Sequence, residues 1–226
     1  MSDQSKKLRG LIGAVYSQAK QNNFSMFKLE TRFTYSPSDK LLFSINPEYV
    51  HNPNKTQYFT TVNYDGSNKY ILASLDSHIL SASIRVNYTV NPELSIQYYG
   101  QPFIFRAKYN QFKYVTNPTA DNLNNRFNLY NENQIDFTNN YYSIDHNLDG
   151  NTDYGFYNPN FSTVQFRSNL VVRWEYRKGS ELYFVWSQGL NTFIDTSESL
   201  VDGIGIGLKE KPENTVLIKA TFSLGN

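Results

Sequence analysis

The residues of this chain that best suit metal chemistry lie in one short segment, Asp145–Asp153. The segment reads DHNLDGNTD, so oxygen-bearing side chains stand at its positions 1, 3 and 5, and a glycine follows at position 6. Calcium-binding loops use this order because alternate oxygens surround a hard cation while the glycine permits a sharp turn. We therefore predict a Ca²⁺ site with ligands from Asp145, Asn147, Asp149, Asn151 (through its carbonyl) and Asp153.

This predicted calcium loop lacks the last ligand of the usual motif. Its position 12 is Phe156 where an EF-hand has a bidentate glutamate, and no helices are predicted beside it. Asp136 or water would have to complete the coordination shell. The alternative is a polar surface loop held by turns in which Asn and Asp side chains bond nearby backbone groups.

The three histidines give a weaker signal for metal binding. His51, His78 and His146 are far apart in the sequence and do not show the spacing of zinc ligands. We predict turn or surface roles for them.

The sequence also lacks a convincing catalytic motif. The glycines of segment 203–207 are not followed by the Lys and Ser or Thr of a phosphate-binding loop, so we predict a flexible return before the last strand. No G-x-S-x-G nucleophile motif occurs. Glu30 and Glu175 could form an acid/base pair, but nearby arginines favour a structural charge network. We predict that the protein is not an enzyme.

The elements that must position these residues are β-strands, because polar and apolar residues alternate along most of the chain. In segment 164–188 the alternation runs from Val164 to Tyr176, breaks at a turn, and resumes from Leu182 to Trp186. Such a period of two gives a strand one apolar and one polar face. We predict nine or ten antiparallel strands and no helix, with turns at Asn22–Asn23, Ser36–Asp39, Asn52–Asn54, Asp65–Asn68, Asn91–Glu93 and Arg177–Gly179.

The composition restricts the class of β protein. The chain has 226 residues, with 18 Tyr and 16 Phe, no Cys and a formal net charge of +1. This charge gives no reason to expect nucleic acid as a partner, and the lack of Cys excludes disulfides and thiolate metal sites. A mean hydropathy of -0.55 and the lack of long apolar runs exclude a helical membrane protein. Aromatic girdles of a transmembrane barrel would explain the many aromatic residues.

The fold that we predict is all-β, an antiparallel up-and-down transmembrane β-barrel of about ten strands over residues 1–226. Segments 79–90, 164–176 and 214–224 reach the roughly 9–11 residues that a spanning strand needs. Outward apolar faces would contact lipid. Charged residues on the polar faces would line the lumen or hold a plug; they are Lys28, Glu30, Arg32, Arg85, Arg173, Glu175 and Lys219. The alternative is a soluble β-sandwich carbohydrate-binding module, with its apolar faces buried against each other.

Residues 116–163 form the longest stretch without a predicted strand. Because outer-membrane barrels have long extracellular loops and short periplasmic turns, we place this stretch outside the cell or in the lumen. Its aromatic side chains could stack on sugars, or they could pack the loop against itself or the barrel rim. They include Phe127, Tyr130, Tyr141, Tyr142, Tyr154 and Tyr157.

The amino terminus resembles an export signal, but its apolar run is too short for one. The basic residues 6–9 precede the apolar run Leu11–Val15, which is shorter than the 7–15 residues of a signal peptide core. We predict that this segment is the first strand. An export signal is then expected upstream of Met1, which would make this chain the carboxy-terminal part of a longer one. Whether the barrel closes by pairing segment 8–16 with segment 214–224 stays open.

One segment carries a family resemblance. The sequence RWEYRKGSELYFVW at 173–186 resembles the RWEYRPGSTLxxVW signature of a Bacteroidota outer-membrane family of unknown function, with Lys178 replacing a proline. Further segments fit in the same order over residues 24–226: NYTVNPELS at 87–95, YYGQPF at 98–103 and PENTVLIK at 212–219.

The resemblance implies a function that the residues alone do not. Members of that family carry an amino-terminal domain similar to family-nine carbohydrate-binding modules, followed by a β-barrel, and a similar Asp- and Gly-rich segment. The resemblance covers only the carboxy-terminal region of that pattern, so the binding domain and the early strands are expected upstream of Met1. The expected role is the anchoring or transport part of a bacterial cell-surface protein that binds or takes up glycans, with outer-membrane lipid, glycans and the upstream domain or strands as partners.

Overall fold

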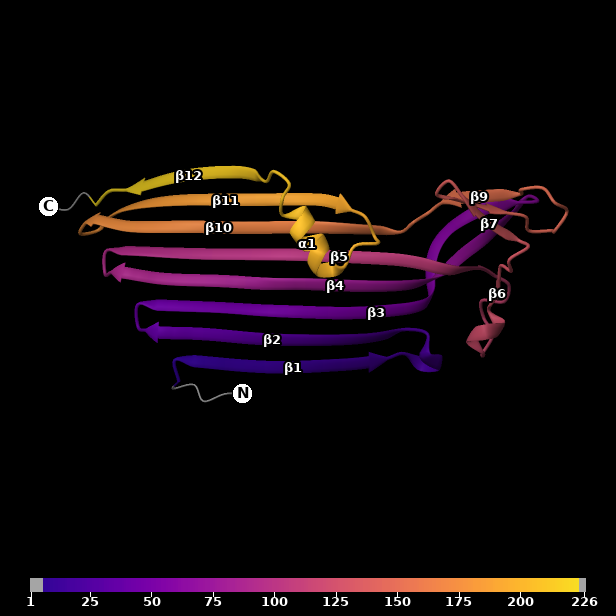
Figure 1. Cartoon of the computed structure of the whole chain (residues 1–226), viewed down its shortest axis with the longest axis horizontal. Coiled ribbons are helices and arrows are strands. Elements are labelled where there is room, and N and C mark those ends of the chain that lie inside the picture. The colour runs from indigo at the N-terminus through magenta and orange to yellow at the C-terminus, as the bar shows by residue number, and fades with distance from the viewer. Residues whose placement is uncertain (1–5, 224–226) are drawn as a thin grey trace.

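The computed structural model describes residues 6–223 and consists mainly of one large antiparallel sheet (Figure 1). Its strands follow one another in the order β1-β2-β3-β4-β5-β10-β11-β12, and β6 adds to the end of β5. Their bounds are β1 Leu8–Gln18, β2 Ser25–Ser38, β3 Leu41–Tyr64, β4 Ser67–Asn91, β5 Leu94–Val115, β6 Phe127–Leu129, β10 Phe161–Arg177, β11 Ser180–Ile194 and β12 Glu213–Thr221. The prediction of an all-β antiparallel fold is therefore confirmed.

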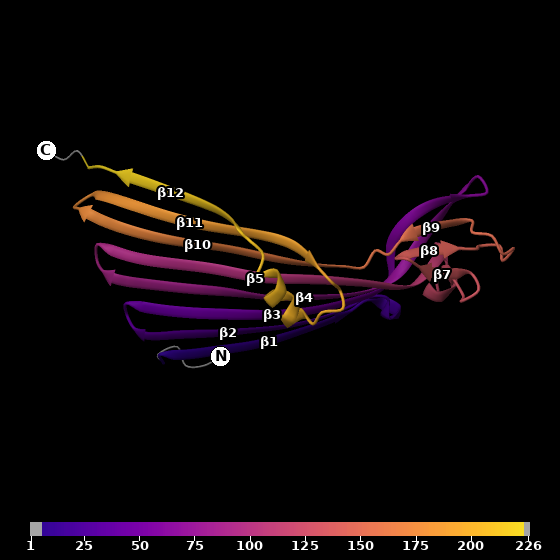
Figure 2. The same cartoon turned by 45° about the horizontal axis from the view of Figure 1, so that its top comes forward.

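The predicted closed barrel is not found. Within residues 6–223, β1 pairs with β2 alone and β12 pairs with β11 alone, so the sheet has two open edges. Figures 1 and 2 show the long strands side by side as a curved layer with β1 and β12 at opposite edges. The sheet has an end with short turns between β2 and β3, β4 and β5, and β10 and β11, on the left of Figure 1. We call it the turn end, and the opposite end the loop end.

One predicted turn is wrong, because its residues lie inside strand β3. Asn52–Asn54 lies inside this strand of 24 residues rather than at a turn. Pro53 has no N–H to donate, and a register shift follows it between Asn54 and Gln57, as is usual where a proline enters a sheet. The predicted turn at Asp65 and Gly66 is confirmed: both have positive φ, 50° and 71°, as the tight turn of a hairpin requires.

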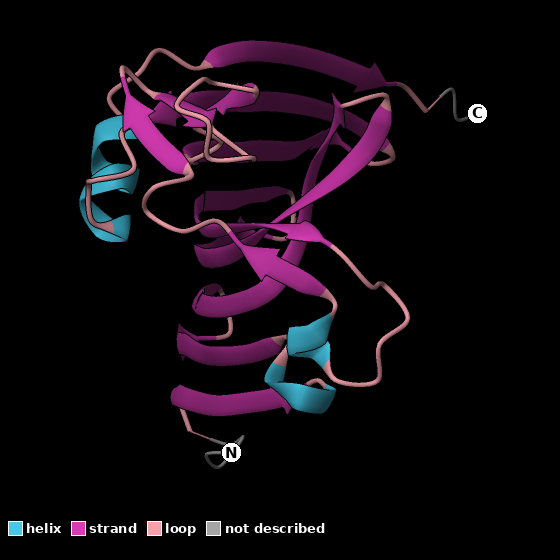
Figure 3. Cartoon of the chain, turned by 90° about the vertical axis from the view of Figure 1, so that its right-hand side faces the viewer, coloured by secondary structure: helices cyan, strands magenta, loops and turns pink. Residues whose placement is uncertain are grey.

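The prediction of no helix is wrong at α1, Leu200–Gly207, in the segment expected to be a flexible return. Ser199 caps the helix by accepting a hydrogen bond from the Asp202 N–H. Gly203 and Gly207 lie one turn apart and let the helix approach the sheet closely. A Cβ at Gly207 would lie 2.5 Å from Val164, so a larger residue does not fit there. The helix stands to one side of the sheet (Figures 1 and 3).

Residues 116–163 are also more ordered than predicted. They contain β6 and a second, three-stranded sheet of β7 Ile135–Thr138, β8 Tyr141–Ile144 and β9 Tyr154–Tyr157. Short 3₁₀ turns occur at η1, Lys20–Asn22, and η2, Leu123–Asn125. The second sheet lies at the loop end, where β3, β4 and β5 extend past the other strands (Figures 1 and 2). The described residues therefore contain twelve strands rather than nine or ten.

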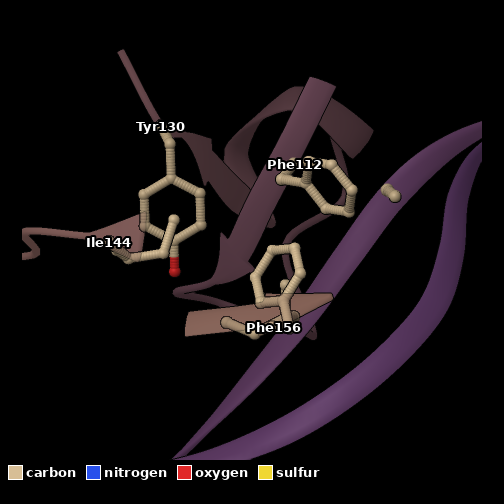
Figure 4. Packing of buried hydrophobic residues seen from close by; sticks show 6 residues of the cluster. Phe112, Tyr130, Ile144 and Phe156 are labelled. Carbon is tan, nitrogen blue, oxygen red and sulfur yellow. The ribbon is translucent and has the colours of Figure 1, made fainter. Parts of the chain in front are cut away.

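A hydrophobic cluster joins the second sheet to the extended strands (Figure 4). Phe112 from β5 contacts Phe156 of β9 and Tyr142 of β8, with ring centroids 4.8 and 4.7 Å apart. The buried members are Ile71, Ala73, Phe112, Tyr130, Ile144 and Phe156. Three aromatic residues of the predicted loop, Tyr130, Tyr142 and Tyr154, therefore pack in or against this cluster.

Strand register assigns alternate residues of the large sheet to two opposite faces. Leu80 of β4 lies opposite Tyr49 of β3 and Ile104 of β5, and Ile104 lies opposite Val164 of β10. We call the side that carries these residues the apolar face. Much of it is exposed: Ile12 of β1 is 75% exposed and Ile218 of β12 is 67% exposed. Helix α1 packs on this face near Ile104 and Val164.

Candidate functional site

The predicted calcium loop connects β8 to β9 and is held by its own carboxylates. Asp145 accepts hydrogen bonds from the backbone N–H groups of Leu148 at 2.7 Å and Gly150 at 2.8 Å. Asp153 closes the loop by accepting from the His146 N–H at 2.7 Å. These contacts explain why Asp occupies both ends of the segment, since each satisfies backbone donors of a tight turn.

The middle of the loop follows the same principle. Asn147 donates its amide N–H to Asp149 at 3.1 Å, and Asp149 accepts the Asn151 backbone N–H at 2.9 Å. This backbone hydrogen bond is the main reason that the pKa of the Asp149 carboxyl lies below its ordinary value. The structure therefore places all five predicted ligands in one compact loop.

The carboxylate oxygens of this loop do not surround one common point, as the ligands of a bound cation would. In the part of the chain that the structure describes, the oxygens of Asp145, Asp149 and Asp153 do not form a group within 4.8 Å of one another. Asp136, considered as outside help, instead accepts a hydrogen bond from the Thr138 hydroxyl at 2.8 Å on β7. The loop is built as a turn scaffold, and calcium binding there stays a prediction.

His146 connects this loop to the aromatic cluster. Its ring lies against Tyr64 and Tyr114, with centroids 4.8 and 4.7 Å apart, and its Nδ1 pairs with the Tyr154 hydroxyl at 3.0 Å. The pKa of His146 lies below its ordinary value. Burial is the main cause, and the positive charge of Lys69 lowers the pKa further.

The seven charged residues predicted to line a lumen share the face opposite the apolar face. Several of them have partners there outside this set of seven. Lys28 pairs with Glu30 at 3.1 Å and with Glu48 of β3 at 2.8 Å. The Lys28–Glu48 pair follows from register, because Glu48 lies opposite Glu30 and two residues from Val50, the partner of Lys28, on the same face.

A second charged group lies on the same face across β10, β11 and β12. Arg173 pairs with Glu181 of β11 and with Glu175 at 3.5 Å, and Glu181 also accepts the Tyr183 hydroxyl at 2.7 Å. Lys219 stands over the Tyr183 ring at 5.9 Å. Arg85 belongs to neither group and stands 4.9 Å from the centre of the Tyr99 ring.

Two open hollows occur on this charged face. One, of about 290 Å³, is bordered by Glu30, Arg32 and Glu48 near β2 and β3. The other, of about 530 Å³, is bordered by Arg167, Lys211 and polar residues of β10 and β11. Both are lined by hydrogen-bonding side chains, which suits water, sugars or ions better than apolar ligands.

The structure also brings together two histidines that are far apart in the sequence. His51 of β3 and His78 of β4 are register partners, and Asp76 lies two residues before His78. Asp76 Oδ1 lies 2.7 Å from His51 Nε2 and 3.2 Å from His78 Nε2. Both histidines lie inside strands rather than in turns, and their proximity depends on a pairing register that spacing in the sequence does not reveal.

Comparisons with known proteins place the chain in a family. No helix among residues 6–223 is long and apolar enough to cross a membrane. Neither a curated protein nor a solved structure matches the chain. A family described as a domain of unknown function, DUF5916, matches residues 1–224. The chain therefore belongs to the DUF5916 family.

Proposed function

We propose that this chain forms the wall of a β-barrel in a bacterial outer membrane, as the anchoring or transport part of a cell-surface protein that binds or takes up glycans. The observation that carries the proposal is an exposed apolar band on a sheet of long strands. In a water-soluble protein such a face would need a covering layer. In a membrane, lipid covers it.

The height of the band matches a bilayer. On β4, alternate residues from Tyr88 to Leu80 are Tyr, Val, Ile, Ala and Leu, and the next residue on that face is His78. These nine residues extend about 30 Å at roughly 3.3 Å each, close to the ~25 Å apolar band of tilted barrel strands. On the neighbouring strands β3 and β5 the same face also changes from apolar to polar at this level, because His51 and Arg106 lie opposite His78.

Aromatic side chains mark the turn end of the band. Trp174 and Tyr176 of β10 contact each other with centroids 6.0 Å apart, and Tyr176 contacts Phe222 beyond β12. Tyr35 and Tyr88 are exposed at the same end of their strands. Aromatic girdles at the membrane interface have this placement, because their rings suit the headgroup region.

Helix α1 lies at the opposite margin of the band. It packs on Ile104, Val164 and Ile194, at the level where the face becomes polar, and its own Val201 stays exposed. A short helix with exposed apolar residues at this level suits the interface between lipid and water. Beyond it, the second sheet and the calcium loop would project outside the membrane.

The charged face would then line the interior of the barrel. Its Lys28–Glu48 and Arg173–Glu181 pairs satisfy charges across neighbouring strands, as expected for side chains that face water or a plug. The outer edges of β1 and β12 would need strand partners, since unpaired backbone groups in lipid cost several kcal/mol each.

The alternative is a soluble β-sandwich that binds carbohydrate. The second sheet is too small and lies beyond the strand ends, so among the described residues it does not cover the apolar face. The exposed ring of Tyr157 on β9 is the feature that favours sugar contact at this end.

Refolding with and without detergent micelles tests the membrane proposal. We expect a β-rich species that forms only with detergent and migrates differently on a denaturing gel before and after heating. Two neighbouring substitutions on β4 make the test specific. Val86→Arg on the apolar face should cost about 2–4 kcal/mol in a bilayer, whereas Asn87→Arg on the charged face should have little effect. A monodisperse β-rich protein without detergent would favour the soluble alternative.

A further inference from the structure

We propose that His51, Asp76 and His78 form a binding site for a divalent transition-metal ion, with Zn²⁺ as the representative ligand. In the described residues these three are the group of His, Cys, Asp and Glu side chains whose potential ligand atoms all lie within 4.8 Å of one another. Two imidazoles and one carboxylate are a common ligand set for Zn²⁺, and imidazole also suits Cu²⁺ and Ni²⁺.

The two strands fix all three ligands. Hairpin register places His51 directly opposite His78, and Asp76 opposite Pro53 on the same face. Side chains two residues apart on a strand point to the same side, so Asp76 and His78 must project together. The His51 and His78 rings lie parallel, 4.4 Å apart with an interplanar angle of 5°.

A tyrosine orients one of the rings. The Tyr49 hydroxyl lies 2.8 Å from His78 Nδ1, which leaves Nε2 on the Asp76 side as the available ligand atom. Metal-binding histidines are usually held in this way, with the second ring nitrogen bonded to a protein group.

The site is open to solvent and keeps a free coordination position. The side chains of His51, Asp76 and His78 are 34%, 46% and 18% exposed. An ion with bonds of about 2.0–2.2 Å needs ligand atoms roughly 3.4 Å apart and nitrogen lone pairs that converge on it. The lone pairs of two parallel rings do not converge, so one exposed ring must turn out of the stack. Three protein ligands leave a fourth position for water or a small exogenous ligand.

The nearby cations leave the Asp76 carboxylate available. Arg106 lies opposite His78 on β5, but its guanidinium donates to the Glu198 carbonyl at 2.7 Å, before α1. Lys108 lies opposite Asp76, yet within residues 6–223 the ion pairs of Asp76 are with the two histidines. The negative charge of Asp76 therefore faces the imidazoles, where it would face the ion.

Zinc titration of the refolded full chain tests the site. Isothermal titration with ZnCl₂ in a non-chelating buffer should show one equivalent bound. His51→Ala and His78→Ala should each weaken binding at least ten-fold, and Asp76→Asn, which keeps the side-chain volume, should do the same. Tyr49→Phe removes only the orienting hydroxyl and should weaken binding about ten-fold.

The third histidine supplies the matched control. His146→Gln leaves the proposed ligands intact and should bind Zn²⁺ like the parent chain, and excess Ca²⁺ should not compete. Co²⁺ substitution should give the visible absorption of a four-coordinate site, lost in Asp76→Asn. Binding that survives Asp76→Asn and both histidine variants, or that His146→Gln abolishes, would overturn the proposal, as would no binding by the parent chain. The result does not depend on whether the sheet lies in a membrane.

Discussion

At the scale of single residues, the calcium loop shows why a motif can be found in a sequence without its chemistry being settled. Asp145 and Asp153 stand where calcium ligands are expected, and the structure gives both a role as acceptors for backbone N–H groups. Both roles need an oxygen at the same position. The composition of the loop was therefore predictable, but the spacing cannot separate a turn scaffold from a cation site.

A charge-removing substitution separates these two roles. Asp145→Asn keeps one oxygen to accept the Leu148 N–H, loses the second oxygen that accepts the Gly150 N–H, and removes one negative charge. If the loop binds Ca²⁺, millimolar Ca²⁺ should raise the melting temperature of the parent chain but not of Asp145→Asn. Asp39→Asn, in the turn between β2 and β3 at the other end of the sheet, is the control and should keep the Ca²⁺ response. Equal melting temperatures of the parent chain with Ca²⁺ and with a chelator would contradict the prediction of a calcium site.

His146 makes the stability of the loop end depend on pH. Its pKa is lowered in the folded state, so the unfolded state binds more protons just below its ordinary value of 6.5. The contribution of neutral His146 is complete above about pH 6.5 and is lost as the pH falls toward the folded pKa. Thermal unfolding between pH 8 and pH 5 should show this loss in the parent chain and less of it in His146→Gln. Identical pH profiles would contradict it.

At the scale of elements, the long strands were predictable because alternation is a local signal. The hairpin of β10 and β11 occurs where the period of two and the Arg177–Gly179 turn predicted it. Strands β6 to β9 were missed because segments of three or four residues are too short to show a period. The pairing of His51 with His78 was missed because two register shifts in the β3–β4 hairpin change the alignment that its turn would set.

Helix α1 was missed because its sequence is a poor helix former. Glycine occupies three of the positions from 203 to 207, and each costs about 1 kcal/mol relative to alanine in a helix. Packing on Val164 and Ile104 must therefore stabilise the helix, and the glycines that weaken it also allow that contact.

Alanine substitutions along α1 test this explanation. Gly207→Ala puts a methyl group against Val164 and should destabilise the protein by about 1–3 kcal/mol through overpacking. Gly205→Ala meets open space and should stabilise by roughly 0.5–1 kcal/mol. Chemical unfolding of the two variants measures the difference. The explanation is wrong if both substitutions change stability in the same direction and by the same amount.

At the scale of the whole molecule, the sheet separates an apolar face from a charged one over eight neighbouring strands. The alternation predicted two unlike faces for each strand, and by register the seven charged residues lie on one face of the sheet. Barrel closure could not be derived from alternation, because a period of two describes each strand and not the pairing of the first with the last. We propose that the apolar face contacts lipid.

Fluorescence quenching by brominated lipids measures that contact directly. Both tryptophans, Trp174 and Trp186, lie on the apolar face. In vesicles with brominated acyl chains, we predict strong quenching of each tryptophan when the other is replaced by Phe. As a control, Tyr99→Trp in a chain without the two native tryptophans places the probe on the charged face and should be quenched little. Unquenched Trp174 and Trp186, or equal quenching of the Tyr99→Trp probe, would contradict the account.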